Sequence, residues 1–212
     1  MAEGQYAGRG QHQNRWHSET GKNLTFSILL MPGFLPVSQQ FDLTRAISLG
    51  IMNALEPLLG NKLKIKWPND IYYADGKLGG ILIENIVQGN QIKNSVIGIG
   101  LNINQDNFPL DVPNAVSLKQ ILHMDYDLKL ILSEICKNIE AAYLNLKAGR
   151  FDSVRKAYLE RLYWLNEDKM FKANGQVFAG MIKDVKDNGL LVVINGSDAS
   201  EFNQKEIEFL NK

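Results

Sequence analysis

The residues best suited to bind and activate a ligand lie in four short segments of the chain. The first is Gly8-Arg9-Gly10, in which two glycines flank an arginine. Glycine lets the backbone approach a ligand closely, and a guanidinium binds carboxylate and phosphate groups. The segment lacks the preceding strand and following helix of a dinucleotide fingerprint, so by itself it also fits an ordinary surface turn.

The second segment is Lys66-Trp67-Pro68-Asn69-Asp70, at the end of an alternating strand pattern. Pro68 keeps Trp67 extended and ends the ladder of backbone hydrogen bonds, because proline has no N–H to donate. Asn69 and Asp70 then stand at the strand end, where a polar pair can face a ligand. A plain Asn-Asp turn is the alternative interpretation.

The third and fourth segments place glycines on strands. Lys77 precedes Gly79-Gly80 and a buried apolar run, so its ammonium can lie near a phosphate or carboxylate; a solvated hairpin lysine is the alternative. Further along, Gly98 and Gly100 occupy alternate positions of an apolar strand. Alternate residues share one face of a strand, so that face loses its side chains and leaves room for a ligand.

Hydrophobic periodicity predicts the elements that must position these segments. The first 23 residues are expected to form a loop. Strands are expected at 23–31, 62–67, 71–73, 80–87 and 92–104. Helices are expected at 41–59, at 125–146 with Asp127 as a cap, and at 151–164. After 164 the pattern changes to short strands with Asn-Gly turns, expected at 176–183, 190–194 and 206–210.

Composition places the chain among globular proteins. It has 212 residues, 45% of them apolar, with 23 Lys and Arg against 23 Asp and Glu. This length supports one domain, or one domain with a small appendage, and the zero net charge gives no overall field to hold nucleic acid or an anionic membrane. The longest apolar stretch, 24–37, is broken by Pro32 and Gly33, so it is not expected to span a bilayer. The polar, glycine-rich start does not resemble a secretory signal, and the sequence predicts a cytoplasmic protein without membrane contact.

Few residues suit metal or thiol chemistry. The lone cysteine, Cys136, excludes an internal disulfide and lies in an apolar-periodic stretch, so a buried thiol is expected. His12 and His17 have no third histidine nearby in the sequence, so a metal site is not expected. Together with Arg9 and Arg15 they could suggest RNA binding, but no basic aromatic stripe continues the pattern.

The four segments, in this order, resemble the biotin–protein ligase family (biotin–[acetyl-CoA-carboxylase] ligase). The matching elements are the Gly-Arg-Gly loop with Trp16 downstream, the KWPND strand end, the KLGGILIE strand and the GIGLNIN strand. The resemblance implies that residues 1–164 form a biotin- and ATP-binding catalytic domain. Its implied fold is α+β, with a mixed β-sheet flanked by helices as in class II aminoacyl-tRNA synthetases. A small SH3-like β-barrel is implied over residues 165–212.

The reaction that the resemblance implies has two steps. The carboxylate of biotin attacks the α-phosphate of ATP to give biotinyl-5′-AMP, and a lysine of a biotin carboxyl carrier protein domain then takes up the biotinyl group. Arg9 and Lys77 match the residues that neutralise the reacting anions, with Mg²⁺ on the triphosphate. Asp70 matches a residue that orients or deprotonates the acceptor lysine.

The resemblance assigns further positions to ligand binding. The implied set is Gln5, Gly8, Arg9, Gly10, Gln11, Arg15, Trp16, Asn69, Lys77, Gly79, Gly80, Gly98, Gly100 and Asn102. In it, Gln5 and the backbone of 9–11 would contact biotin and Trp16 would pack against the adenylate. The four strand glycines would give the ligand clearance against the sheet.

The chain also departs from the family pattern. It begins too late to contain the family's upstream serine/threonine-rich segment, so part of the biotin pocket and a first strand are expected to be missing, and the unpaired sheet edge would favour a homodimer. Residues 11–15 carry fewer arginines and glycines than usual. A DNA-binding helix-turn-helix domain is not present at the front, so neither DNA binding nor a repressor role is expected. Two alternatives stay open: a lipoate or octanoate ligase, and an inactive remnant that binds biotin weakly.

Overall fold

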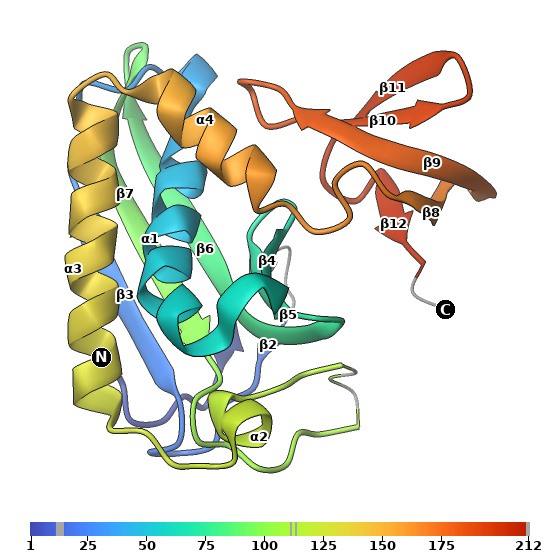
Figure 1. Ribbon diagram of the computed structural model, residues 1–212. Helices are drawn as coiled ribbons and strands as arrows, with labels where there is room; N and C mark the ends of the chain where they lie inside the picture. The colour runs from blue at the N-terminus through green and yellow to red at the C-terminus, as the bar shows by residue number, and fades with distance from the viewer. Residues whose placement is uncertain (12–14, 111, 113, 211–212) are drawn as a thin grey trace.

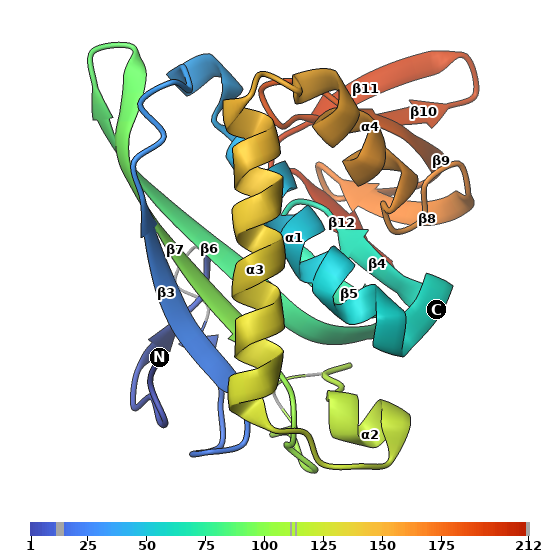
Figure 2. The ribbon, with the colours of Figure 1, turned by 60° about the vertical axis from the view of Figure 1, so that its left-hand side comes forward.

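A five-stranded β-sheet with helices on one face forms the larger part of the molecule (Figure 1). The structure is a computed structural model and describes residues 1–11, 15–110, 112 and 114–210. The strands are β3 (Leu24–Leu30), β4 (Leu63–Lys66), β5 (Asp70–Tyr73), β6 (Gly76–Gln88) and β7 (Gln91–Leu101), in the order β3-β7-β6-β5-β4. The helices are α1 (Phe41–Leu59), α3 (Leu128–Lys147) and α4 (Phe151–Glu160). Figure 2 shows α1 and α3 along the same face of the sheet.

Neighbouring strands of this sheet are antiparallel throughout. Strands β4 to β7 follow one another through short turns, and a short turn reverses the direction of the chain, so consecutive strands must pair antiparallel. Strand β3 pairs with the remaining edge of β7 along its whole length. The expectation of a mixed sheet is therefore wrong for the described residues, whereas the combination of helices with an antiparallel sheet agrees with the α+β class.

The helices pack closely on one another as well as on the sheet. Helix α1 has the bounds that its apolar spacing predicts, 41–59. It crosses α3 at Gly50, where a Cβ would lie 2.5 Å from the Cα of Ile139, so a glycine is needed at this crossing. Helix α3 begins at the expected cap, because the carboxylate of Asp127 accepts hydrogen bonds from the N–H groups of Lys129 and Leu130.

A second antiparallel sheet, called here the C-terminal sheet, follows α4. Its strands are β8 (Asp168–Ala173), β9 (Gln176–Val185), β10 (Leu191–Asn195), β11 (Asp198–Phe202) and β12 (Ile207–Phe209), in the order β11-β10-β9-β8-β12. Phe171 is fully buried at its centre, edge-on to the rings of Trp164 and Phe209. The sequence pattern predicts β9, β10 and β12 but neither β8 nor β11. Those two strands carry mostly charged or small residues, so pairing with neighbours, not an apolar pattern of their own, defines them.

Other local features differ from expectation. The first residues form two short strands, β1 (Gly8–Arg9) and β2 (Arg15–Trp16), inside the expected loop. A short helix, α2 (Leu118–Leu122), begins at a capping box formed by Ser117 and Gln120. Cys136 is exposed, not buried, because α3 turns the neighbouring Ile135 and Ile139 toward the core instead.

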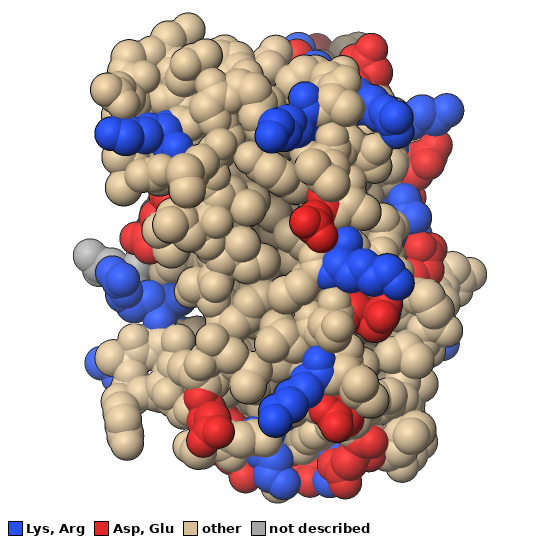
Figure 3. Space-filling view, turned by 90° about the vertical axis from the view of Figure 1, so that its left-hand side faces the viewer, with Lys and Arg blue, Asp and Glu red and all other residues tan. Residues whose placement is uncertain are grey.

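The surface carries charges of both signs. On the face drawn in Figure 3, lysine and arginine side chains lie interspersed with aspartate and glutamate among uncharged residues. This distribution agrees with the zero formal net charge of the chain. Within the described ranges, no helix has both the length and the apolar character needed to cross a membrane.

Candidate active site

A cavity of about 220 Å³ lies on the face of the sheet that the helices leave uncovered. Its floor is built from residues at alternate strand positions: Thr25, Ser27, Gly80, Leu82, Gly98 and Gly100. They lie in register, because Gly80 pairs with Gly100, and Gly98 pairs with both Leu82 and Ser27. Their sequence neighbours on β6 and β7, including Ile81, Ile97 and Ile99, are buried in the core. The period of two thus separates a ligand face from a core face.

The glycines of the floor play different parts. A Cβ at Gly98 would lie 3.7 Å from the nearest atom, the carbonyl oxygen of Leu82, so the space above Gly98 is open. Gly100 is instead covered by the indole of Trp16, and a Cβ there would collide with that ring. The floor therefore has one part open to a ligand and one part filled by an aromatic ring.

The β1–β2 hairpin closes one side of the cavity. Gly8 pairs with Trp16, and Arg9 pairs with Arg15. A Cβ at Gly8 would collide with the carbonyl of Trp16 and lie 2.6 Å from Oε1 of Gln5, so only glycine fits. Both arginines are exposed and line the cavity, where two guanidiniums on opposed strand positions can bind an anion together.

A lysine and an aspartate face each other on the opposite side. The Nζ atom of Lys77 lies 2.8 Å from Oδ2 of Asp70, and the side chains are 32% and 24% exposed. Asp70 opens β5 opposite Gly80 of β6. Both side chains therefore reach the cavity while remaining accessible to a ligand.

Hydrogen bonds from neighbouring segments fix the backbone of Lys77. Its N–H donates to the carbonyl of Asn114 (2.6 Å), and its carbonyl accepts from the N–H of Val116 (2.9 Å). The buried side-chain amide of Asn102 donates to the carbonyls of Lys77 (3.4 Å) and Val116 (3.2 Å). Asn102 therefore supports the strand that carries Lys77 and does not line the cavity.

Asn69 joins the strand end to the floor of the cavity. Its side-chain amide donates to the carbonyl of Ile81, and the N–H of Ile81 donates to the carbonyl of Asn69 (3.0 Å). The preceding Trp67–Pro68 peptide bond is cis, and the carbonyl of Pro68 accepts a hydrogen bond from Tyr158 (3.4 Å). Since its amide nitrogen is already engaged, Asn69 lines the cavity as a fixed part of the wall.

Two buried polar atoms of the cavity lining have no hydrogen-bond partner among the described residues. They are Oε1 of Gln11, an acceptor, and Nε1 of Trp16, a donor. Buried polar groups in native proteins are nearly always paired, by protein, water or ligand. The described protein thus leaves one acceptor and one donor unpaired in the cavity lining.

Comparison with known proteins agrees with this geometry. A sequence model of the biotin/lipoate A/B protein ligase family matches residues 1–102, which include the β1–β2 hairpin, the Asp70–Lys77 pair and the glycine floor. The match covers 102 of the 212 residues, just under half of the chain.

Two similar proteins carry the names of ligases. The bifunctional ligase/repressor BirA of Bacillus subtilis (strain 168) is 26% identical over 211 residues, which are 98% of this chain and 65% of that protein. The biotin–[acetyl-CoA-carboxylase] ligase of Mycobacterium tuberculosis is 28% identical over 194 residues, 90% of this chain and 71% of that one. The chain thus spans 65% of the length of the Bacillus relative.

A solved structure supports the fold. The biotin protein ligase of Aquifex aeolicus, in complex with biotin and ATP, has a TM-score of 0.83 to this chain and covers all of it, with 88% of that protein covered in turn. The sequence identity is 24%, so this likeness concerns the fold.

Most of the positions that the ligase resemblance assigns do line the cavity. They are Gln5, Arg9, Gly10, Gln11, Arg15, Trp16, Asn69, Asp70, Lys77, Gly80, Gly98 and Gly100. Gly8 and Gly79 stand outside the lining, as Asn102 does. A Cβ at Gly79 would collide with Leu101 on the core side, because the adjacent Gly80 takes the position that faces the cavity. Gly79 therefore makes room for Leu101, not for a ligand.

Some residues of the cavity lining lie outside the sequence motifs. Thr25 and Ser27 alternate with apolar residues on β3, and this period of two could have marked them. Leu82 shares the face of Gly80 on β6. Gln204, from the turn after β11, also lines the cavity, and no local signal in the sequence predicts it.

The described residues of the lining carry three cations and one carboxylate: Arg9, Arg15 and Lys77 against Asp70. A further lysine, Lys66, lies opposite Asp70 on β4. Burial lowers the pKa of the Lys66 ammonium, and Asp70 opposes that shift. The excess of positive charge suits a polyanionic ligand. Among the residues described, no group of three or more His, Cys, Asp or Glu side chains could hold a metal ion; His12 lies outside those residues.

Proposed function

We propose that the protein is an ATP-dependent biotin ligase, which activates biotin as biotinyl-5′-AMP and transfers it to a lysine of a biotin carboxyl carrier protein domain. One observation carries the proposal: Arg9, Arg15 and Lys77 converge on a cavity whose floor is cleared by glycines. The names of the relatives and the biotin and ATP in the Aquifex aeolicus structure support it.

The first step brings two anions together, and the cavity suits that task. A carboxylate and a triphosphate repel one another, so their approach requires cations that neutralise the charge developing at the α-phosphate. In the proposal the ammonium of Lys77 separates from Asp70 and binds the reacting oxygens, while Arg9 and Arg15 bind phosphate oxygens. The biotin carboxylate oxygen then forms the new bond to phosphorus, and pyrophosphate leaves.

Biotin itself is an apolar bicycle with a ureido group, and the floor offers both kinds of contact. The open surface above Gly98 and beside Leu82 would receive the aliphatic part. The ureido group carries N–H donors and a carbonyl oxygen, so it could pair with Oε1 of Gln11 and with Nε1 of Trp16, the two atoms that lack partners. The hydroxyls of Thr25 and Ser27 are further partners on the same face.

The second step requires a neutral amine. The amine nitrogen of the acceptor lysine attacks the carbonyl carbon of the mixed anhydride, the bond from that carbon to the phosphate oxygen breaks, and AMP leaves. Asp70 is the single carboxylate among the described cavity residues, so we assign to it the orientation of the amine and the acceptance of its proton.

Several finer points belong to the same proposal. Mg²⁺ would arrive with ATP and be held chiefly by phosphate oxygens, since the described residues hold no metal-binding group of their own. Residues 1–164 would form a catalytic domain related to class II aminoacyl-tRNA synthetases, and 165–212 an SH3-like unit that helps to dock the carrier domain. A cytoplasmic location would follow from the need for ATP. DNA binding and a homodimer are questions for separate experiments.

The test is a pair of assays on the purified chain. Biotin-dependent exchange of pyrophosphate into ATP measures the first step, and labelling of a purified carrier domain measures the second. The same assays with lipoate or octanoate in place of biotin test the alternative ligase. Turnover with lipoate but not with biotin, or no turnover with either acid, would contradict the proposal.

A further inference from the structure

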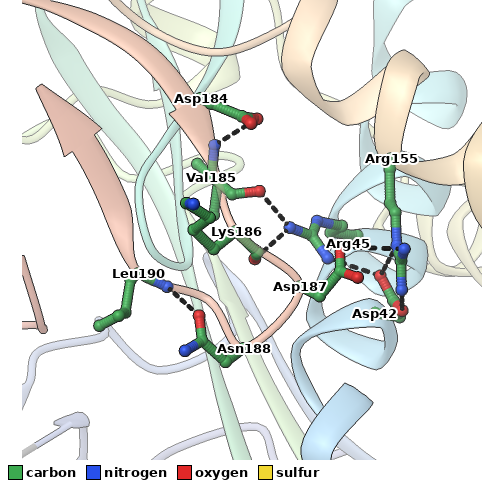
Figure 4. Close-up of polar contacts among 9 residues, drawn as sticks. All are labelled: Asp42, Arg45, Arg155, Asp184, Val185, Lys186, Asp187, Asn188 and Leu190. Carbon is green, nitrogen blue, oxygen red and sulfur yellow. Dashed lines mark hydrogen bonds and ion pairs between the residues drawn. The ribbon is translucent and has the colours of Figure 1, made fainter. Parts of the chain in front are cut away.

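An arginine of α1 reaches into the C-terminal sheet. Arg45 is 1% exposed, and one of its terminal nitrogens donates to the carbonyls of Val185 and Lys186, both at 2.7 Å (Figure 4). These carbonyls lie at the end of β9, 140 and 141 residues further along the chain. A buried guanidinium bonded to two carbonyls is a strong and specific link, because charge-assisted hydrogen bonds exceed neutral ones in strength.

The charge of Arg45 is balanced by a fully buried aspartate. Its other terminal nitrogen lies 2.5 Å from Oδ1 of Asp42, one turn earlier on α1. Asp42 also accepts a hydrogen bond from Arg155 of α4 (2.7 Å). Arg155 in turn forms an ion pair with Asp187 (2.9 Å), in the turn that follows β9. Figure 4 shows these side chains meeting between the two helices and the turn. Three elements are therefore tied together at one point.

The turn that Arg45 holds contacts the strand end of the active site. After Lys186 the chain reverses, and the carbonyl of Gly189 accepts a hydrogen bond from Nε1 of Trp67 (2.9 Å). A Cβ at Gly189 would lie 2.7 Å from the ring of Phe41, so this close approach requires glycine. Trp67 is buried and directly precedes the segment 68–70, which forms one wall of the cavity.

We infer that Arg45 is a positioning residue for the active site. It fixes the turn 186–190 against Trp67, and that contact fixes Asn69 and Asp70 in the cavity wall. The same anchorage sets the C-terminal sheet, whose Gln204 lines the cavity. The catalytic part of this inference rests on the proposed function, whereas the structural part can be measured without any activity.

The experiment compares two variants with a control. Arg45→Met removes the link, and Trp67→Phe keeps an aromatic ring at position 67 but removes the indole N–H that meets Gly189. Arg161→Met is the matched control, because among the described residues the side chain of Arg161 forms a partly exposed ion pair with Glu56 and donates to the carbonyl of Ala157, both outside the C-terminal sheet. Hydrogen exchange of backbone amides, read by mass spectrometry, reports on 184–190 and 67–71 in each protein. Biotin-dependent pyrophosphate exchange gives kcat and KM.

Arg45→Met should speed amide exchange in both segments, and Trp67→Phe chiefly in 67–71, while the control leaves both unchanged. Both variants should lower kcat by about 10- to 100-fold, the cost of a misplaced catalytic group, with a smaller change in the KM for biotin. Arg45→Lys, which keeps the positive charge on a single donor nitrogen, should recover part of kcat.

The inference is overturned if Arg45→Met loosens 184–190 but leaves 67–71 and kcat as in the wild type. It is overturned equally if Trp67→Phe behaves like the control. A wild-type chain without exchange activity would instead contradict the proposed function, and the amide-exchange comparison would still decide the structural link. If Arg45→Met does not fold, Trp67→Phe and Arg45→Lys decide the question.

Discussion

The ammonium of Lys77 lies 2.8 Å from the carboxylate of Asp70. Both side chains are partly exposed to the same cavity, so the pair can open when a stronger anion arrives. In the proposed reaction this exchange of partners frees Lys77 for the phosphate and leaves Asp70 free for the acceptor amine. The two residues thus serve successive steps from one resting ion pair.

Replacing Lys77 by alanine should abolish adenylate formation while the fold remains. Loss of one contact that stabilises developing charge costs roughly 10²- to 10³-fold in rate. Biotin-dependent pyrophosphate exchange is the measurement. Lys119→Ala is the control, because Lys119 forms ion pairs with Asp106 and Asp125 and does not line the cavity. Pyrophosphate exchange at the wild-type rate in Lys77→Ala would contradict the role assigned to Lys77 in adenylate formation.

Gly98→Ala should weaken biotin binding without lowering the melting temperature. The added methyl group would stand 3.7 Å from the nearest protein atom, so it fits the protein and fills only the space proposed for the ligand. The Kd for biotin should rise about tenfold. Overpacking a fitted site costs about 1–3 kcal/mol, and about 1.4 kcal/mol corresponds to a tenfold change in Kd.

Titration calorimetry and thermal unfolding test this together. The contrasting variant is Gly79→Ala, whose Cβ would collide with Leu101 and the backbone of Gly100 on the core side. That variant should lower the melting temperature. Unchanged biotin affinity in Gly98→Ala would show that the ligand does not lie over this part of the floor.

Phe171→Ala should destabilise the C-terminal sheet. Phe171 is 0% exposed and contacts three aromatic rings, those of Trp164, Phe178 and Phe209. A buried Phe→Ala substitution costs about 3–5 kcal/mol in the free energy of unfolding. Urea unfolding measures the change. Val177→Ala on the exposed side of β9 should stay within about 0.5 kcal/mol of the wild type, and an equal loss there would contradict the assigned core.

The protein should lose stability above about pH 10. Burial raises the pKa of Tyr72, Tyr158 and Tyr163, and Asp75 adds to the shift at Tyr163 through a 2.6 Å hydrogen bond. A pKa that is higher in the folded than in the unfolded chain favours folding below the ordinary pKa of 10.0, and this contribution falls as the pH rises above that value.

Tyrosinate absorbance followed together with circular dichroism checks this expectation. Tyrosines on the surface should ionise first, and the buried ones only as the fold is lost. Tyr163→Phe removes the hydroxyl that Asp75 accepts from, so it should shift the alkaline unfolding midpoint. Ionisation of all tyrosines in one step near pH 10, with the fold intact, would count against this picture.

Much of the cavity lining could be predicted from the sequence because its motifs are local. Arg9 and Gly10 are neighbours, and Gly80 with Leu82, like Gly98 with Gly100, alternate along one strand. The period of two then decides which face they share. The same local reasoning predicts helix 41–59 to its ends and the cap of the next long helix.

Only the tertiary structure decided how these segments meet. The periodicity of a segment reports which of its own faces is buried, and says nothing of which distant segment covers that face. Asn102 thus lies behind Lys77 and not in the cavity, and Gln204 joins the cavity from the C-terminal sheet. Arg45 is a charged residue within the apolar pattern of α1, and it is buried because its guanidinium finds partners there. Asp42 lies one helical turn earlier, and the two backbone carbonyls lie about 140 residues further along the chain. Hydrogen bonds to such distant residues produce no periodic pattern in the sequence.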